Sequence, residues 1–143
     1  MAAFPVTDLR AYLIGRWRIE RRIRDRRLRC DGLFQGDAEF NNDGAGLRYE
    51  ETGVLRFGDY QGQARRAAHY QFSAPDRAIV TFEDGGLFHD LDLTTGLWRV
   101  LHPCGFDLYR GRIAARAPDC WATAWRVSGP RKDQVMLATY TRA

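Results

Sequence analysis

From residue 15 to the end of the chain, apolar and polar side chains alternate with a period of two. In residues 16–24, Trp17, Ile19 and Ile23 share one parity, and charged side chains occupy the other. This pattern is typical of a β-strand with one buried and one solvated face. The same alternation predicts nine further strands, over residues 32–41, 47–57, 64–72, 78–82, 88–93, 97–102, 106–115, 121–128 and 134–142.

The connections between these segments are short and rich in turn residues. Residues 41–44, 84–86 and 94–96 are hairpin signals, and Gly53 indicates a bend or a bulge within its strand. No connection is long enough for a crossover helix, so the strands must be antiparallel. The sequence therefore predicts an all-β fold, an up-and-down barrel of about eight to ten strands. A two-sheet sandwich is the alternative.

One short helix is expected ahead of the first strand, over residues 7–13. Thr7 is its predicted N-cap, Asp8 lies in its first turn, and Gly15 ends it. The 143 residues, with a hydrophobic content of 45%, fit a single domain over residues 1–143.

Cysteine content and apolar run length narrow the cellular setting. The longest apolar runs are far shorter than the roughly 20 residues of a transmembrane helix, so no membrane span is expected. Cys30, Cys104 and Cys120 are an odd number without a CxxC motif or a visible secretory signal, which indicates the cytoplasm. His102 and Cys104 lie close together, but no second pair has zinc-finger spacing, so no metal site is expected.

The chain is basic, with a formal net charge of +4 and a run of arginines between residues 16 and 29. Glu20, Asp25 and Asp31 interrupt this run, and its charged face carries no aromatic stacking platforms. We therefore expect a solvated strand face, and no nucleic-acid partner.

The segment Tyr12 to Trp17 resembles the Gly-x-Trp signature of the lipocalin-like (calycin) superfamily. The resemblance implies that a short helix closes one end of the barrel and that Trp17 packs beneath it. It also implies a basic residue from the last strand lying across that tryptophan, and Arg142 stands at this place in the sequence.

Three further segments, residues 84–89, 102–109 and 125–133, resemble an uncharacterised bacterial and eukaryotic family with a lipocalin-like domain. This resemblance implies the fold and carries no assigned function. The chain departs from secreted lipocalins, which carry a signal and disulfides, towards intracellular relatives such as fatty-acid-binding and nitrobindin-like barrels.

Residues 102–109 hold the densest set of candidate functional side chains. His102 is in phase with the apolar face of its strand, and Asp107 and Tyr109 share parity on the next. A tight connection at residues 103–105 is expected to bring His102 beside Asp107, where a carboxylate raises the imidazole pKa and fixes its tautomer. A structural network, ligand orientation and acid–base catalysis all remain open for this pair.

His89, Trp125 and Glu51 are further candidates for the barrel interior. His89 is in phase with two leucines, and Trp125 is predicted to be a wall or core residue. Glu51 falls on the face that should be buried, where a carboxylate needs a partner.

Arg66 or Arg21 is expected to supply the partner of Glu51, as a core ion pair or as a group that binds a ligand carboxylate. The alternative is a bulge at Gly53 that inverts the face on which Glu51 lies.

These features favour an intracellular barrel that binds a small, partly apolar molecule through His102, Asp107, Tyr109, His89, Glu51 and Trp125. One alternative is a haem-binding, nitrobindin-like barrel with His102 or His89 as axial ligand. A second is an acid–base enzyme, an isomerase or hydrolase, that uses His102 and Asp107. A third is an interaction or scaffold barrel filled by its own side chains. The sequence identifies neither the ligand, nor a cofactor, nor the oligomeric state.

Overall fold

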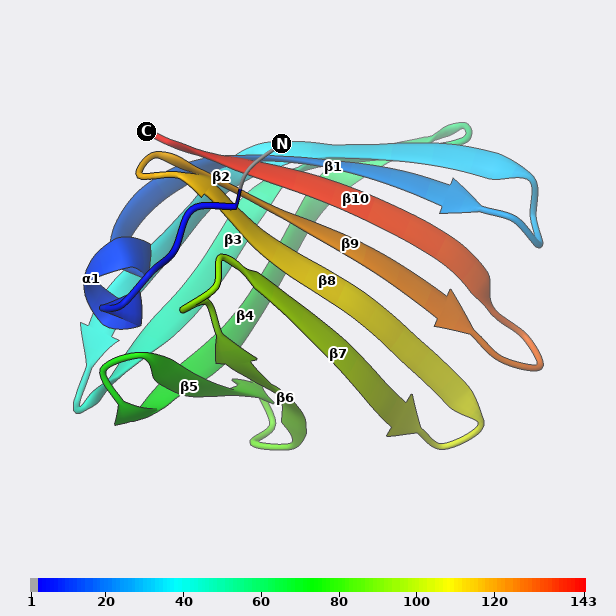
Figure 1. Cartoon of the computed structure of the whole chain (residues 1–143). Coiled ribbons are helices and arrows are strands. Elements are labelled where there is room, and N and C mark those ends of the chain that lie inside the picture. The colour runs from blue at the N-terminus through cyan, green and yellow to red at the C-terminus, as the bar shows by residue number, and fades with distance from the viewer. Residues whose placement is uncertain (1–2) are drawn as a thin grey trace.

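The computed structural model describes residues 3–143, which form one short helix and a 10-stranded antiparallel sheet (Figure 1). The sheet curls into a nearly closed barrel, and the helix lies at one end of it. No helix within these residues has the length and apolar character that a membrane crossing requires. The elements are α1 (Leu9–Leu13), β1 (Gly15–Asp25), β2 (Cys30–Asp43), β3 (Gly46–Phe57), β4 (Tyr60–Ala74), β5 (Arg77–Phe82), β6 (Leu87–Asp92), β7 (Leu97–Cys104), β8 (Asp107–Ala117), β9 (Cys120–Ser128) and β10 (Asp133–Arg142).

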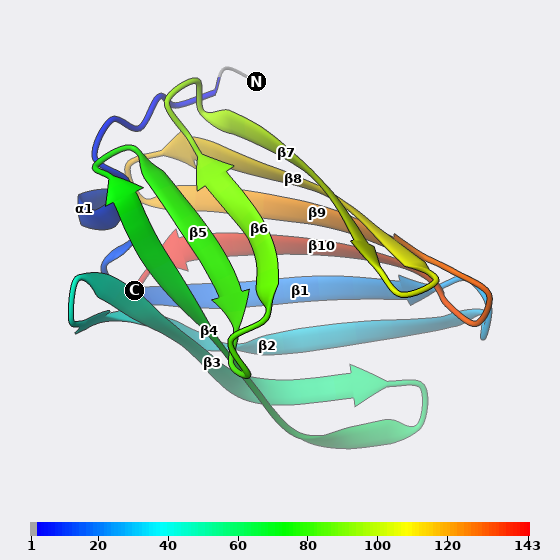
Figure 2. The ribbon, with the colours of Figure 1, turned by 90° about the horizontal axis from the view of Figure 1, so that it is seen from below.

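The strand order around the barrel is β6-β5-β4-β3-β2-β1-β10-β9-β8-β7. Sequence neighbours pair as hairpins, with one exception among the described residues: β6 and β7 do not pair, so the hairpin predicted at residues 94–96 is wrong. The strand β1 pairs with β10, so the first and last strands join the two halves of the sheet (Figure 2). The ends of the sheet, β6 and β7, meet at a seam that no backbone ladder spans in the described chain. Across this seam the indole Nε1 of Trp98 donates to the carbonyl of Asp90, at 2.9 Å. The predicted up-and-down barrel is confirmed, and no sandwich forms.

All ten predicted strands are present, and they differ from the prediction only near their ends. The largest difference is in β4, which begins at Tyr60 rather than at residue 64. The first residues of β4 pair with β3 in a hairpin whose tip lies in water, with Tyr60 57% exposed. The alternation is absent there because no core demands apolar side chains, so the pattern could not locate this end.

The helix begins at Leu9, and its N-cap is Asp8 rather than the predicted Thr7. The Asp8 carboxylate accepts a hydrogen bond from the backbone N–H of Ala11 at 3.0 Å, which satisfies one of the free donors of the first turn. A helix of five residues is too short to be stable alone. Its stability comes from burying Leu9 and Leu13, both fully inaccessible to solvent.

The closure predicted from the Gly-x-Trp resemblance is confirmed in atomic detail. Trp17 is fully buried, and its Nε1 donates to the carbonyl of Leu13 at 2.8 Å. The Arg142 guanidinium lies over the Trp17 ring, 3.7 Å from its centroid. The same guanidinium donates to the carbonyls of Tyr12 at 2.7 Å and Ile14 at 2.9 Å. Arg142 therefore ties the last strand to both the first strand and the helix C-terminus.

The register is continuous at Gly53, which pairs directly with Gly36 on β2. A Cβ atom on Gly53 would lie 2.2 Å from the backbone oxygen of Gln35, and one on Gly36 would lie 2.0 Å from that of Thr52. The two strands thus approach too closely for any side chain at this glycine pair. The predicted bulge at Gly53, which would have turned Glu51 to the outer face, is therefore wrong. Glu51 points into the barrel, as the alternation predicted.

Replacing Arg142 with methionine should lower the unfolding free energy by about 2 kcal/mol. The substitution removes two charge-assisted hydrogen bonds and a cation–π contact. Urea denaturation measures the change. Arg16→Met is the matched control, because Arg16 makes only a surface ion pair with Glu39 and should lose far less. Equal losses in the two variants would contradict the assigned role of Arg142.

Candidate functional site

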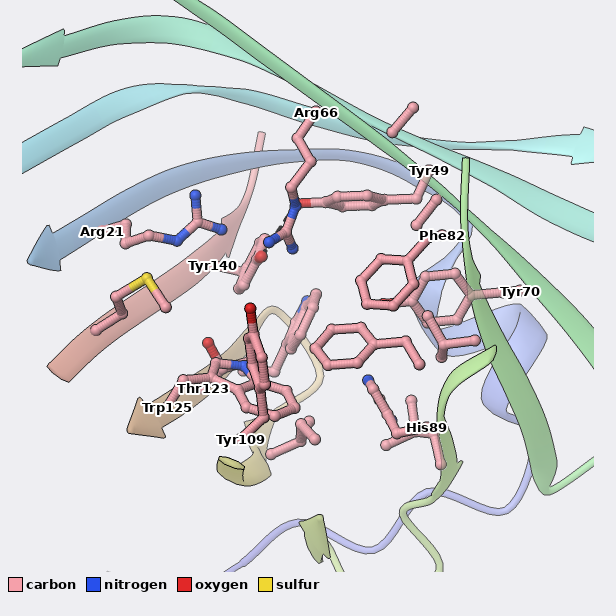
Figure 3. Close-up of a pocket in the computed structure, with 18 residues that line it drawn as sticks. Arg21, Tyr49, Arg66, Tyr70, Phe82, His89, Tyr109, Thr123, Trp125 and Tyr140 are labelled. Carbon is pink, nitrogen blue, oxygen red and sulfur yellow. Dashed lines mark hydrogen bonds between the residues drawn. The ribbon is translucent and has the colours of Figure 1, made fainter. Parts of the chain in front are cut away.

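A cavity of about 100 Å³ lies inside the barrel, and side chains from β1, β3–β6 and β8–β10 line it (Figure 3). Its wall is mainly aromatic and aliphatic, and its two guanidinium groups, with the hydroxyls of three tyrosines, lie on β1, β3, β4 and β10. His89, Tyr109 and Thr123 add polar groups from β6, β8 and β9. The lining residues are Arg21, Tyr49, Arg66, Ala67, Ala68, Tyr70, Val80, Phe82, Phe88, His89, Leu91, Tyr109, Ile113, Trp121, Thr123, Trp125, Met136 and Tyr140.

A buried ion pair stands behind the polar end of the cavity. The Arg21 guanidinium binds the Glu51 carboxylate with both nitrogens, Nη1 to Oε2 at 2.6 Å and Nη2 to Oε1 at 3.0 Å. The Glu51 side chain is 3% exposed and that of Arg21 is 13% exposed. The pair spans β2, whose inward residues next to Glu51 are Ala38 and Gly36. These small residues leave room for a side chain on β1 to reach a side chain on β3.

Two tyrosines extend this pair into a directional chain of hydrogen bonds. Tyr49 Oη lies 2.6 Å from Glu51 Oε1 and 3.0 Å from Tyr140 Oη. A carboxylate only accepts, so the single hydroxyl proton of Tyr49 points to Glu51. Tyr140 must therefore donate to Tyr49, and Tyr140 in turn stacks on Trp121 with ring centroids 3.7 Å apart. Burial raises the pKa of both phenols, which keeps these donors protonated.

The ionisation of Glu51 is set by two opposing effects. Burial acts to raise its pKa, but the hydrogen bonds from Arg21 and Tyr49 and the charges of Arg21 and Arg66 outweigh it, so the net pKa lies below the ordinary value. Burial likewise acts to lower the pKa of Arg21, and the contacts with Glu51 and the two tyrosines raise it overall. Both members of the pair are therefore charged at neutral pH.

His89 presents one ring nitrogen to its own strand. Its Nδ1 lies 2.6 Å from the carbonyl of Asp90, which only accepts, so Nδ1 carries the proton. Burial lowers the pKa of His89, against the weaker raising effect of this hydrogen bond. The neutral ring is thus fixed in one tautomer, and its Nε2 is a hydrogen-bond acceptor. Figure 3 shows the ring directed into the cavity.

The apolar wall is built from stacked rings on β5, β6 and β9. Phe88 stacks on Phe82 with centroids 4.6 Å apart, and on Trp125 at 5.0 Å. The ring of His102 packs edge-on against Phe88 at 5.6 Å, and Tyr109 lies 6.0 Å from His102. Such an arrangement suits a flat, apolar ligand body.

The expected contact between His102 and Asp107 does not form. The β7–β8 register pairs His102 with Tyr109, and Asp107 with Cys104, so the two side chains lie two rungs apart. Asp107 instead lies 3.4 Å from Lys132, and no hydrogen bond or ion pair joins it to His102 in the described chain. The turn is at residues 105–106, nearer the C-terminus than expected, and this shifts the register.

The structure brings three of the six sequence-predicted site residues to the cavity surface: His89, Tyr109 and Trp125. Glu51 lies directly behind it, and His102 packs against its wall. Asp107 belongs to the β7–β8 turn region instead. Within residues 3–143, no group of three or more His, Cys, Asp or Glu side chains gathers to hold a metal ion.

Sequence reasoning did not single out most of the wall, including Phe82, Phe88, Tyr140 and Met136. Parity places Phe82, Tyr140 and Met136 on an inward face. Phe88 is out of phase with Leu91, and it lines the cavity beside His89 where the β5–β6 register shifts after Val80. The missing information was the tilt of the strands, which decides the level at which each inward side chain lies.

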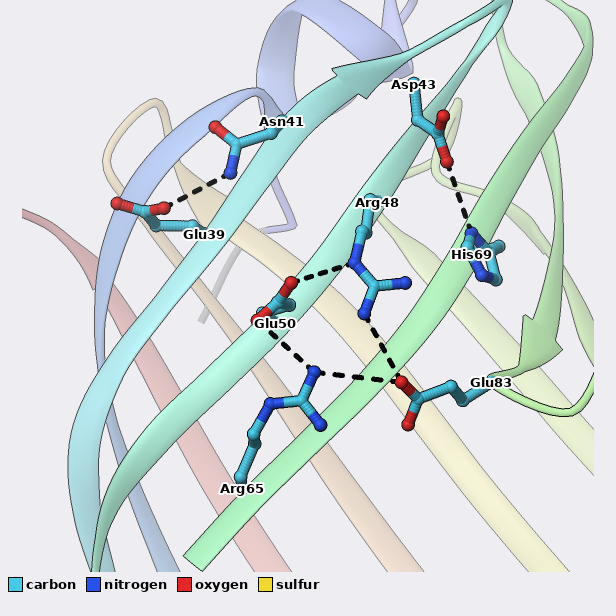
Figure 4. Close-up of polar contacts among 8 residues, drawn as sticks. All are labelled: Glu39, Asn41, Asp43, Arg48, Glu50, Arg65, His69 and Glu83. Atoms are coloured by element: carbon cyan, nitrogen blue, oxygen red, sulfur yellow. Dashed lines mark hydrogen bonds and ion pairs between the residues drawn. The ribbon is translucent and has the colours of Figure 1, made fainter.

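Glu51→Gln should lower the unfolding free energy by about 3–5 kcal/mol, because it leaves the Arg21 charge buried without its partner. The adjacent Glu50→Gln is the matched control: Glu50 pairs with Arg48 and Arg65 on the outer face (Figure 4) and should matter much less.

The difference between wild type and Glu51→Gln should depend on pH. The folded-state pKa of Glu51 lies below the ordinary 4.5, so the ion pair stabilises above that pH and is lost as the pH falls through the folded-state pKa. Urea denaturation at several pH values from 3 to 7 measures the unfolding free energy of both proteins, and the difference between them should decrease as the pH falls. A difference that stays constant over the range would show that Glu51 does not act as a carboxylate.

Three solved structures share the fold. The S-type phycobiliprotein lyase CPES from Guillardia theta is 9% identical, with a TM-score of 0.66 over 98% of this chain and 93% of that one. A DUF3598 protein of unknown function from Nostoc punctiforme is 15% identical with a TM-score of 0.63, and this chain spans 51% of its length and aligns over 100% of its own. Rv2717c from M. tuberculosis is 10% identical, with a TM-score of 0.54 over 98% and 99% of the two chains.

No curated protein matches the sequence. One family model does, described as a family of unknown function, DUF6314, and it covers residues 13–142. The match begins at the end of α1 and runs through the whole barrel, including Trp17 and Arg142. The chain therefore belongs to the DUF6314 family.

Proposed function

We propose that this protein binds a small, partly apolar molecule inside its barrel. The observation that carries the proposal is the cavity itself, which combines stacked aromatic walls with a polar end. Concave, mostly apolar sites with a few placed polar groups are the usual form of a small-molecule site. The ligand body would lie against Phe88 and Trp125, within reach of His89 and Tyr109.

The size of the cavity limits the ligand. An apolar cavity of about 150 Å³ holds a benzene molecule, and this one measures about 100 Å³. One ring is therefore the largest body that fits inside, and any substituent on that ring would lie towards the open side of the cavity. Haem binding has less support, because a porphyrin is several times larger than the cavity.

An acid–base enzyme and a filled scaffold barrel also have less support. The enzyme based on His102 and Asp107 loses its premise, because the pair does not form. A barrel filled entirely by its own side chains has no place for the cavity. We place the binding function in the cytoplasm as part of the proposal, and the free thiols of Cys30, Cys104 and Cys120 agree with a reducing compartment.

Cinnamamide is a suitable neutral probe, since it joins one aromatic ring to a short conjugated amide. Ligand-observed NMR should show saturable binding to the wild-type protein. Thr123→Phe places a ring in the cavity and should weaken binding at least about tenfold, or ~1.4 kcal/mol. Thr139→Phe, on the exposed face of the neighbouring strand, should bind as wild type does.

Circular dichroism establishes that both variants fold. Binding that survives Thr123→Phe unchanged would place the probe outside the cavity, and a wild-type protein that binds neither cinnamamide nor the corresponding acid, cinnamate, would refute the proposal.

A further inference from the structure

The polar end of the cavity holds more positive than negative charge. Glu51 stands between two guanidinium groups, those of Arg21 and Arg66. Arg21 uses both terminal nitrogens on the carboxylate, in a closed bidentate pair. Tyr49 donates to the same carboxylate. One negative charge is thus already matched by Arg21, and the charge of Arg66 is left in excess.

Arg66 lies directly opposite Glu51 in the β3–β4 ladder, yet its contact with Glu51 is long. Its Nε lies 3.7 Å from Glu51 Oε1, and its terminal nitrogens make no hydrogen bond with any described residue. The side chain is 55% exposed, so water solvates the group and its charge is not stranded in the core. Figure 3 shows Arg66 reaching from β4 towards Tyr140 along the edge of the cavity.

The positive charge of Arg66 also acts on several residues that line the cavity. Burial raises the pKa of Tyr49, Tyr70 and Tyr140, and in each case the Arg66 charge acts in the opposite direction. The same charge acts to lower the pKa of His89. Four lining residues on β3, β4, β6 and β10 therefore experience the Arg66 charge, and Tyr140 also experiences that of Arg21.

An independent observation concerns Trp121, which lines the cavity and is 3% exposed. Its indole Nε1 is buried and has no acceptor among residues 3–143. A buried donor without a partner destabilises the folded state, so such groups are rare unless something else satisfies them. Trp121 and Arg66 thus both offer donors that the chain itself does not use.

We propose that the ligand of this cavity carries an anionic group, of which a carboxylate is the best match, and that Arg66 binds it. The inference rests on the proposed function and names its ligand class: a small aromatic or conjugated acid. The ring lies between the aromatic walls, and the acid faces the planar guanidinium fork, which matches the geometry of a carboxylate. The Arg21–Glu51 pair stays closed and gives the polar end its shape.

The test compares cinnamate with cinnamamide, which have the same ring and linker and differ in charge. Wild-type protein should bind cinnamate at least about tenfold more tightly than cinnamamide in an NMR titration. Arg66→Gln should reduce cinnamate affinity to the level of the amide and leave cinnamamide affinity unchanged. Arg66→Lys should recover part of the preference, because it keeps the charge and loses the fork.

Arg65→Gln is the matched control. Arg65 is the residue immediately before Arg66 on β4, but it points outward and pairs with Glu50 and Glu83 (Figure 4). This variant has the same net charge as Arg66→Gln and should keep the full preference for the acid. Cinnamamide binding serves as an internal check that each variant retains an intact cavity.

The outcomes separate this inference from the proposed function. If neither compound binds, the proposed function fails and the inference fails with it. If the two compounds bind equally well to the wild type, the cavity binds ligands without selecting anions, and only the inference is overturned. A preference for cinnamate that persists in Arg66→Gln, or that disappears in Arg65→Gln, would also overturn it.

Discussion

The ladder between β1 and β10 is the interaction on which the rest of the structure depends. It joins a half built from β2–β6 to a half built from β7–β9, and without it the chain is two open sheets. Arg142 secures its end at the helix, and the contacts among Arg21, Glu51, Tyr49 and Tyr140 cross it farther along the barrel. The same contacts shape the polar end of the cavity, so the interactions that hold the two halves of the sheet together also form the site.

Much of this architecture follows from the sequence, because a period of two reports directly which face of a strand is buried. The ten strands and the buried position of Glu51 were predictable on this basis, and the Gly-x-Trp resemblance predicted Arg142 over Trp17. The contact between His102 and Asp107 was wrongly predicted, because parity fixes the face on which a side chain lies but does not fix its position along the neighbouring strand. A turn displaced along the chain moves the two side chains two rungs apart.

The cavity is harder to predict than the barrel for a related reason. Its wall combines side chains from eight strands, and their meeting level depends on strand tilt and on local features such as the Gly36–Gly53 contact. Arg66 is an example. The sequence offered Arg66 or Arg21 as the partner of Glu51, and the structure shows that Arg21 forms the bidentate pair and that the charge of Arg66 is in excess. Solved structures with 9–15% identity share the fold, so function must be argued from such side chains.

The seam between β6 and β7 gives the barrel a preferred place to open. Separating any of the nine hydrogen-bonded strand pairs of the described chain breaks a backbone ladder, whereas separating β6 from β7 breaks the bond from Trp98 to Asp90 and the packing of His102 on Phe88. The same carbonyl also holds the His89 ring. The seam is therefore the place in the described barrel where opening breaks the fewest backbone hydrogen bonds. Phe88 and His89 belong to β6 and line the cavity, so opening at this seam would give solvent access to the interior at those two side chains.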